Sequence, residues 1–268
     1  MTPEAISSFL DTTITSRIGL RLIAEQHIAL SNSLKEPRTR GGRRIGVVGL
    51  ECSPERLIRM CASFVGSLSD ATLGSSPETI VDGVVDATFA YVPVHLEYIL
   101  TEILKNAYRA SVEHHFALYG SSSSKPIPPV IVTIAPSPDF LSLRIRDQGG
   151  GISPASLPRV FSYAFTTAGR GSSDPETDEG GGGPYAAQHV GGSAAIGGDG
   201  DGYLFGEITE KGLQTGMGTI AGLGYGLPLA RLYANYFGGQ LDLMTLYGHG
   251  TDVFLKLRRL DKPSAAEI

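Results

Sequence analysis

Two side chains that suit phosphoryl chemistry lie one helical turn apart near the middle of the chain. Glu102 and Asn106 stand at positions i and i+4 of a segment whose apolar spacing predicts a helix, so they share one face. A carboxylate there can accept a proton from an attacking hydroxyl, and an amide oxygen suits Mg²⁺. Lys105 and Arg109 are placed to contact phosphate oxygens. Alone the pattern is weak, because such residues usually form a solvated helix surface.

A second feature is an aspartate that follows an apolar strand and precedes three glycines. Asp147 could accept a hydrogen bond from an adenine amino group, while Gly149, Gly150 and Gly151 would let the backbone approach the base or the phosphates. The alternative for this motif alone is an ordinary Asp-Gly turn.

A third feature is a run of alternating glycines at the predicted start of a helix. The run Gly222-Leu223-Gly224-Tyr225-Gly226 could present backbone N–H groups to phosphates, although as an isolated glycine pattern it is weak. Further along, Thr251 lies in a Gly-His-Gly-Thr-Asp turn between two strands and could reach a base directly or through water.

The spacing of apolar residues along the chain predicts helices and strands. Their order argues against repeated βαβ units and favours an α+β fold. We expect long helices at about 5–31, 53–69 and 92–119, and shorter ones at 153–165 and 227–237. We expect strands at 44–50, 79–85, 126–134, 140–146, 241–247 and 251–257, with the last four forming two antiparallel hairpins.

The segment 169–218 holds nearly half of the 35 glycines and few large apolar residues. It cannot bury enough surface to offset the entropy of ordering it. A long glycine-rich segment within a compact domain is usually a lid or is disordered, and the glycine run after it favours a lid.

Composition narrows the functional classes. The chain has 268 residues and a formal charge of −5, with no basic block that would favour a nucleic-acid partner. Cys52 and Cys61 stand in no metal-binding spacing, which argues against a zinc site and for a reducing compartment. No stretch is apolar long enough to span a bilayer, and the first residues, with Glu4 and Asp11, show neither a secretory nor a transit signal.

The order of these features is more specific than any one of them. The polar helix face, the Asp-x-Gly-x-Gly loop, the glycine-rich segment, the glycine-capped helix and the Gly-Thr hairpin together resemble the Bergerat ATP-binding fold of the GHKL superfamily. Several runs also resemble the mitochondrial 2-oxo acid dehydrogenase kinases, and the stretch 16–27 is similar to the last helix of that family's N-terminal bundle. The other runs that carry the resemblance are 102–110, 221–228, 231–237 and 250–252.

The resemblance implies ATP-dependent phosphorylation of a serine on the decarboxylase α subunit of the pyruvate dehydrogenase complex, or of the related branched-chain 2-oxo acid dehydrogenase complex. Phosphorylation would switch the complex off. Glu102 would be the catalytic base, and Asn106 would hold Mg²⁺, with K⁺ as a further candidate cation. The implied nucleotide-binding residues are Asn106, Arg109, Asp147, Gly149, Gly151, Thr166, Thr167, Gly222, Leu223, Gly224, Tyr225, Gly226 and Thr251.

The implied fold class is α+β, an α/β sandwich of mixed sheet and helices preceded by a remnant of a helical bundle. We expect the end of that bundle and a linker at 1–43, the GHKL kinase domain at 44–260 with an ATP lid at about 169–221, and a tail at 261–268. The implied partners are the α subunit, a lipoyl domain and a second copy of the chain, which would pair through the C-terminal sheet. The implied location is the mitochondrial matrix.

The sequence alone does not decide between the pyruvate and the branched-chain dehydrogenase complex as the substrate. The run 165–168 and the absence of an Asp-Trp pair from the tail favour a branched-chain substrate, whereas the run 231–233 favours pyruvate. Tyr98 stands where this family often has a histidine, one turn before Glu102, and this difference bears on how the base is tuned.

Two other classes also stay open. A histidine protein kinase would use His27, which lies on a helix upstream of the ATP domain but lacks the usual proline a few residues later. An interaction protein that binds nucleotide without catalysis would fit a shortened N-terminus and an expanded glycine-rich segment, although the intact Glu102 argues against it.

Overall fold

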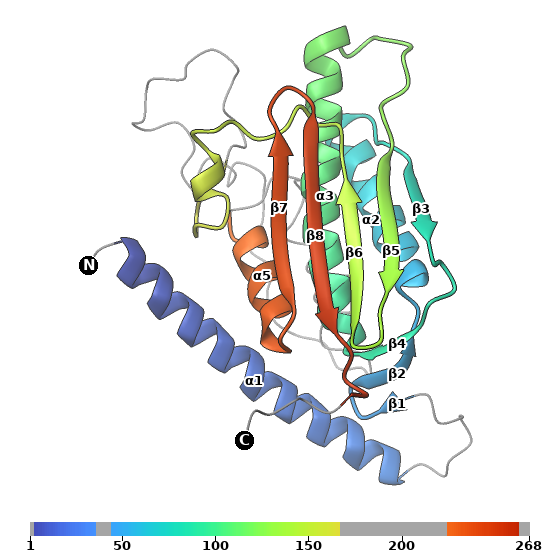
Figure 1. Ribbon diagram of the computed structural model, residues 1–268, viewed down its shortest axis with the longest axis vertical. Helices are drawn as coiled ribbons and strands as arrows, with labels where there is room; N and C mark the ends of the chain where they lie inside the picture. Colours follow the sequence, from blue (N-terminus) through green and yellow to red (C-terminus); the bar gives the residue numbers. More distant parts are fainter. Residues whose placement is uncertain (1–2, 36–43, 167–223, 263–268) are drawn as a thin grey trace.

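The computed structural model describes residues 3–35, 44–166 and 224–262, so the expected lid lies outside the described residues. Helices and strands alternate irregularly along these ranges, as expected for an α+β fold (Figure 1). In chain order the elements are α1 (Pro3–Lys35), β1 (Arg44–Ile45), β2 (Val48–Cys52), α2 (Pro54–Leu73), β3 (Thr79–Gly83), β4 (Phe89–Tyr91), α3 (Pro93–Tyr119), β5 (Val130–Pro136), β6 (Phe140–Arg146), a 3₁₀ turn (Leu157–Arg159), α5 (Gly226–Tyr236), β7 (Gln240–Leu246) and β8 (Gly250–Arg258).

A mixed five-stranded sheet forms one layer of the fold, in the order β3-β5-β6-β8-β7. β3 and β5 run parallel, and the other neighbours run antiparallel, including the two hairpins that the sequence predicts. The parallel pair requires a long crossover, which α3 supplies. A small antiparallel sheet, β1-β2-β4, lies at one end of the molecule (Figure 1).

The helices α2, α3 and α5 cover one face of the large sheet (Figure 1). Alternate residues of β5, β6 and β8 are buried on that face, as the period of a strand with one buried side requires. α3 carries buried residues around most of its circumference, from Leu96 to Val112, because α2 and α5 flank it while the sheet lies beneath it. The position of α3 therefore fixes where its few polar side chains can lie.

Local signals set the ends of α2. The Ser53 hydroxyl accepts a hydrogen bond from the backbone N–H of Arg56 at 3.3 Å, and Pro54 occupies the first turn, as the sequence predicts. The helix continues past the predicted end at residue 69 to Leu73, where Gly74 adopts a left-handed conformation (φ +78°) and accommodates the C-terminal turn.

Three expectations from the sequence are wrong in detail. The expected helix at 153–165 is only a 3₁₀ turn, because Pro154 and Pro158 remove helical N–H donors. The expected strand at 44–50 is a hairpin of β1 and β2 that turns at Gly46, which has a φ of +61°. The sequence pattern missed β4, because three residues are too few to show a periodicity.

The first helix is long but barely packed among the described residues. Only Ile18 of its described side chains is buried, whereas Phe9 and Ile23 are 62% and 69% exposed. α1 lies diagonally across the fold (Figure 1), and the Gln26 side chain accepts a hydrogen bond from the Val47 N–H at 2.8 Å. None of the described helices combines the length and apolar character needed to cross a bilayer.

An aromatic cluster joins the start of α3 to the end of α5. The His95 ring lies 4.8 Å from Tyr233 and 5.6 Å from Phe237, measured between ring centroids. His95 is almost fully buried, and its Nδ1 has no hydrogen-bond partner in the described part of the chain. Burial, reinforced by the charge of Arg21, lowers the pKa of His95 from 6.5 to about 4.

We expect acidification to destabilise the fold through His95. Between pH 6.5 and about 4 the unfolded chain binds a proton on His95 that the folded chain does not, so stability falls as the pH falls through this window. The lost free energy of unfolding approaches about 3 kcal/mol. Urea unfolding of His95→Phe, compared with wild type at several pH values, should show a flatter profile.

The exposed His27 provides the control, as His27→Gln should keep the wild-type profile. Equal slopes for wild type and His95→Phe between pH 4 and 6.5 would contradict the assignment.

Candidate functional site

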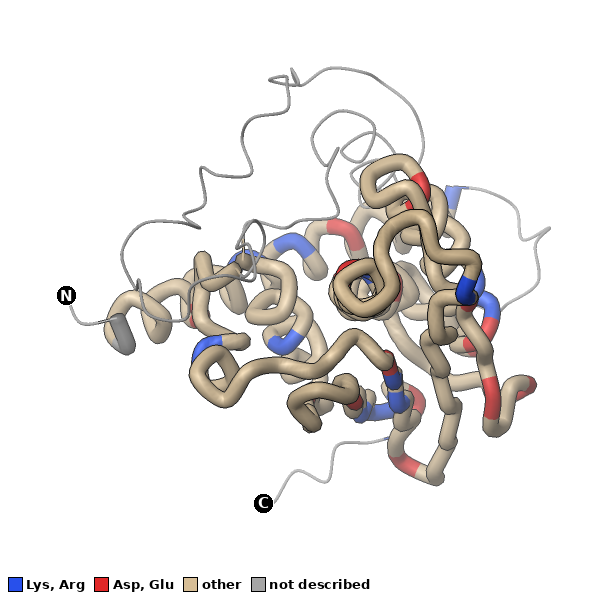
Figure 2. Tube along the Cα trace, turned by 90° about the horizontal axis from the view of Figure 1, so that it is seen from above, with Lys and Arg blue, Asp and Glu red and all other residues tan. Residues whose placement is uncertain are grey.

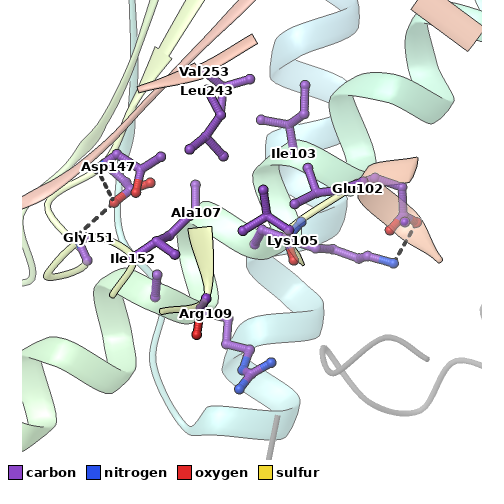
Figure 3. Close-up of a pocket in the computed structure, with 18 of the residues that line it drawn as sticks. Glu102, Ile103, Lys105, Ala107, Arg109, Asp147, Gly151, Ile152, Leu243 and Val253 are labelled. Carbon is purple, nitrogen blue, oxygen red and sulfur yellow. Dashed lines mark hydrogen bonds and ion pairs between the residues drawn. The ribbon is translucent and has the colours of Figure 1, made fainter. Parts of the chain in front are cut away.

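One cavity of about 570 Å³ brings together residues from all three motifs that the sequence singled out (Figure 3). It lies between the polar side of α3, the loop that follows β6, and the start of α5. The predicted site residues that line it are Glu102, Asn106, Arg109, Asp147, Gly149, Gly151, Thr166, Gly224, Gly226 and Thr251.

Glu102 and Asn106 project from adjacent turns of α3 toward this cavity, and Asn106 is exposed there. The Glu102 carboxylate is buried and accepts a hydrogen bond from the Lys105 ammonium at 2.7 Å, marked by a dashed line in Figure 3. The sequence placed Lys105 at phosphate oxygens, yet in this structure its ammonium pairs with Glu102. Removing the Lys105 ammonium would leave the buried Glu102 carboxylate without the partner shown here, which is destabilising for a buried charge.

Arg109 lies one turn further along α3 and also lines the cavity. Its guanidinium Nε donates to the Glu113 carboxylate at 2.7 Å, and Glu113 is half exposed. Because the Glu113 side chain is 51% exposed, water can solvate its carboxylate if Arg109 takes another partner in the cavity. Figure 2 shows basic and acidic positions interspersed along the described chain, so positive charge at the cavity comes from local groups such as Lys105 and Arg109.

Asp147 stands at the other end of the cavity from the α5 start, where β6 passes into its loop. Its Oδ1 accepts hydrogen bonds from the backbone N–H groups of Gly149, at 2.8 Å, and Thr251, at 3.2 Å. Burial raises the pKa of Asp147 to about 6, against the effect of these two hydrogen bonds. With Oδ1 occupied in this way, the second carboxylate oxygen is the acceptor that the arrangement leaves for a ligand in the cavity.

Close approach of two backbones explains the glycine in the Asp147 loop. A side chain at Gly149 would overlap Ala110 of α3 and the neighbouring backbone. Only glycine lets the loop lie directly against the helix, which brings Asp147 and the polar face of α3 into one cavity.

The start of α5 approaches α3 just as closely. Gly226 is the first residue of α5, and a Cβ at this position would overlap the Glu102 carboxylate. No side chain caps this helix end within the described part of the chain, so its first N–H groups are available to an anion. Gly224, with a φ of +79°, packs against the backbone of Ala164 and Phe165.

One described nucleotide contact that the sequence predicted does not join this cluster, and three others cannot be placed. Tyr225 does not line the cavity; its ring lies against Tyr163, 6.0 Å between centroids. Thr167, Gly222 and Leu223 lie outside the described residues.

The sequence reasoning also missed the apolar walls of the cavity. These walls suit a flat aromatic ring and come from apolar side chains to which the sequence assigned no role in binding. Their strand alternation and helical spacing were visible, but which buried side chains border the cavity depends on the packing of α3 against the sheet. Figure 3 labels the main wall residues, Ile103, Ala107, Ile152, Leu243 and Val253.

The donor set of the cavity fits a nucleotide better than a metal held by protein alone. Among the described residues, no group of three or more His, Cys, Asp or Glu side chains could hold a metal ion. A Mg²⁺ ion at Asn106 would therefore depend on phosphate oxygens and water for its remaining ligands, which is its usual coordination in nucleotide sites.

Comparison with known families agrees with this geometry in two separate regions. The family described as Mitochondrial branched-chain alpha-ketoacid dehydrogenase kinase matches residues 1–49. The family described as Histidine kinase-, DNA gyrase B-, and HSP90-like ATPase matches residues 91–190, which include Glu102, Asn106 and Asp147.

Curated relatives match nearly the whole chain. They are named [Pyruvate dehydrogenase (acetyl-transferring)] kinase, mitochondrial, and come from Arabidopsis thaliana (32% identical), Schizosaccharomyces pombe (34%) and Drosophila melanogaster (31%). The matches cover 96%, 96% and 97% of this chain but 58%, 51% and 53% of the relatives, so the chain spans little more than half their length. Both family matches, these relatives and the cavity agree, and the chain is similar to the mitochondrial 2-oxo acid dehydrogenase kinases of the GHKL superfamily.

Proposed function

We propose that this chain is an ATP-dependent protein serine kinase that phosphorylates the decarboxylase α subunit of the pyruvate dehydrogenase complex and so inactivates it. One observation carries the proposal. A single cavity places a buried carboxylate, an uncapped helix start and a second buried carboxylate in the order that a serine, a triphosphate and an adenine ring require. The names of the relatives supply the substrate.

In this proposal the two ends of the nucleotide are held by different elements. Asp147 accepts the adenine amino group, and the backbone N–H groups near Gly224 and Gly226 bind phosphates. Glu102 takes the proton of the serine hydroxyl while the serine oxygen attacks the γ-phosphorus. The bond between the γ-phosphorus and the bridging oxygen breaks, and that oxygen leaves with ADP. Thr251 assists at the adenine end, where its N–H already orients Asp147.

Asn106 is the residue that would hold Mg²⁺, which would neutralise phosphate charge during transfer. Its side chain is exposed to the cavity one turn beyond Glu102 and offers a neutral oxygen. We propose Mg²⁺ as the working cation and K⁺ as a further candidate.

A branched-chain substrate is the second candidate. The match of residues 1–49 to the branched-chain alpha-ketoacid dehydrogenase kinase family favours it, because it covers α1, the element outside the nucleotide site. Purified α subunits of the two complexes, offered in parallel with labelled ATP, separate the candidates. Acid-stable phosphoserine on one of them would identify the substrate, and acid-labile phosphate on the chain itself would instead indicate a histidine kinase.

The remaining assignments follow from the family. We propose that the chain works in mitochondria, as the names of its relatives indicate, and that it contacts a lipoyl domain of the complex. We propose the domain division at residues 43 and 44, and a homodimer formed through the open face of the five-stranded sheet. Sedimentation velocity would test the dimer directly.

We expect Glu102→Gln to abolish transfer while ATP binding is retained. The amide keeps the shape of the carboxylate but cannot take the serine proton, so the transfer rate should fall by a factor of about 100 or more. Transfer of labelled phosphate and calorimetric ATP binding measure the two effects separately. Glu78→Gln, at an exposed position before β3, serves as the control; unchanged transfer by Glu102→Gln would refute its role as the base.

We expect the Asp147→Asn variant to bind adenine nucleotides more weakly and to remain folded. Its carbonyl oxygen can still accept from Gly149 and Thr251, but the amino group that replaces Oδ2 repels the adenine amino group. The affinity for ATP should fall about tenfold to a hundredfold.

Stability at neutral pH should not fall in Asp147→Asn. Because the folded pKa of Asp147 is raised from 3.8 to about 6, its ionisation destabilises the native state as the pH rises through that range, and asparagine removes this effect. Thermal melting and ATP titration, with the exposed Asp139→Asn as control, test both statements. Wild-type ATP affinity in Asp147→Asn would exclude Asp147 from adenine recognition.

A further inference from the structure

A turn with an unfavourable backbone conformation lies beside the phosphate end of the cavity. The Phe165 N–H donates to the Ser162 carbonyl at 3.4 Å, and this bond closes a turn with Tyr163 and Ala164 at its centre. Ala164 has a φ of +59°, and no other non-glycine residue in the described ranges has a positive φ. Because the left-handed region is unfavourable for a residue with a Cβ, contacts on either side must hold this turn in place.

One side of the turn contacts the segment that leads into α5. A Cβ at Gly224 would overlap the backbone of Ala164 and Phe165, so the two segments meet through their main chains. Phe165, Gly224 and Gly226 all line the cavity, where phosphates would meet the first N–H groups of α5. A shift of the turn would therefore move this wall of the cavity.

The other side of the turn is attached to α1. The Tyr163 hydroxyl donates to Asp11 Oδ1 at 2.5 Å, and the Tyr163 ring lies 6.0 Å from that of Tyr225, measured between centroids. Burial, together with the Asp11 carboxylate, raises the pKa of Tyr163, so the phenol remains a donor at neutral pH. Tyr163 does not line the cavity, so its influence on a nucleotide must pass through its neighbours.

We propose that Asp11 and Tyr163 are positioning residues that hold the turn 162–165 against Gly224 and thereby shape the phosphate end of the cavity. The inference rests on the proposed kinase function and adds to it two residues that lie outside the cavity. The hydrogen bond fixes the phenol, and the phenol helps to keep Ala164 in its left-handed conformation. Without the hydrogen bond, Ala164 can relax toward a more favourable φ, and the contact with Gly224 loosens.

The adenine end of the cavity should not respond to this hydrogen bond. Asp147 is oriented by the backbone N–H groups of Gly149 and Thr251, which belong to the loop after β6 and to β8. Neither of these elements includes the turn 162–165. A positioning role of Asp11 and Tyr163 therefore predicts a selective effect on phosphate binding, whereas a general role in stability predicts none.

Ligand binding by the full chain tests this role without relying on transfer. We would measure the affinities for the β,γ-imido analogue of ATP with Mg²⁺ by calorimetry, and for adenosine by displacement, in wild type, Asp11→Ala, Tyr163→Phe and the double variant. Tyr163→Phe keeps the ring that contacts Tyr225 and removes only the hydroxyl. Tyr119→Phe and Thr13→Ala, at exposed positions on α3 and α1, are the controls, and thermal melting confirms that the variants fold.

Each single variant should bind the ATP analogue about threefold to tenfold more weakly than wild type, because one hydrogen bond to a charged but exposed group is lost. Adenosine, which carries no phosphate, should bind within about twofold of wild type. The double variant should bind no more weakly than the weaker single variant, because both substitutions remove the same bond. Both controls should bind the two ligands as wild type does.

Three results would overturn the positioning role. If Asp11→Ala and Tyr163→Phe bind the ATP analogue as wild type does, the hydrogen bond has no influence on the cavity. Equal losses of adenosine and the ATP analogue would show that the effect is not confined to the phosphate end. Losses that add in the double variant would show that the two residues act separately. A wild-type chain that binds neither ligand would instead reject the proposed function itself, and with it this inference.

Discussion

The enclosure of α3 is the constraint on which the rest of the structure depends. The helix lies on the sheet between α2 and α5, and its apolar side chains, from Leu96 to Val112, leave it no freedom to rotate. Rotation by one position would bury Asn106 against the core and expose Leu104. Packing energy spread over many apolar contacts therefore holds the orientation of two polar side chains in one cavity.

Two close backbone approaches complete the cavity around this helix. Gly149 brings the Asp147 loop against α3, and Gly226 brings the start of α5 against Glu102. Both contacts depend on the missing Cβ, and they set the two ends of the cavity independently of each other. The site is thus assembled from three elements far apart in sequence, with the helix as their common support.

The first helix, α1, is attached to the rest of the fold by polar contacts more than by packing into the core. Tyr163, near the end of the described range 44–166, donates a hydrogen bond to Asp11 of α1 at 2.5 Å, and its ring lies against Tyr225. Gln26 holds the turn between β1 and β2. Most of the large apolar side chains described on α1 are exposed.

The sequence by itself indicated the family resemblance, the main helices and hairpins, and ten of the residues that line the cavity, because helical spacing, strand alternation and glycine motifs are local signals. Glu102 and Asn106 share a face by helix geometry alone, and Asp147 follows a strand that its own alternation marks. Only the tertiary structure decided that the Glu102–Lys105 pair is buried, that Tyr225 does not line the cavity, and that the segment 153–165 contains only a 3₁₀ turn. These outcomes depend on how α3, α5 and the loop after β6 pack against one another, and packing between distant segments leaves no periodic mark in the sequence.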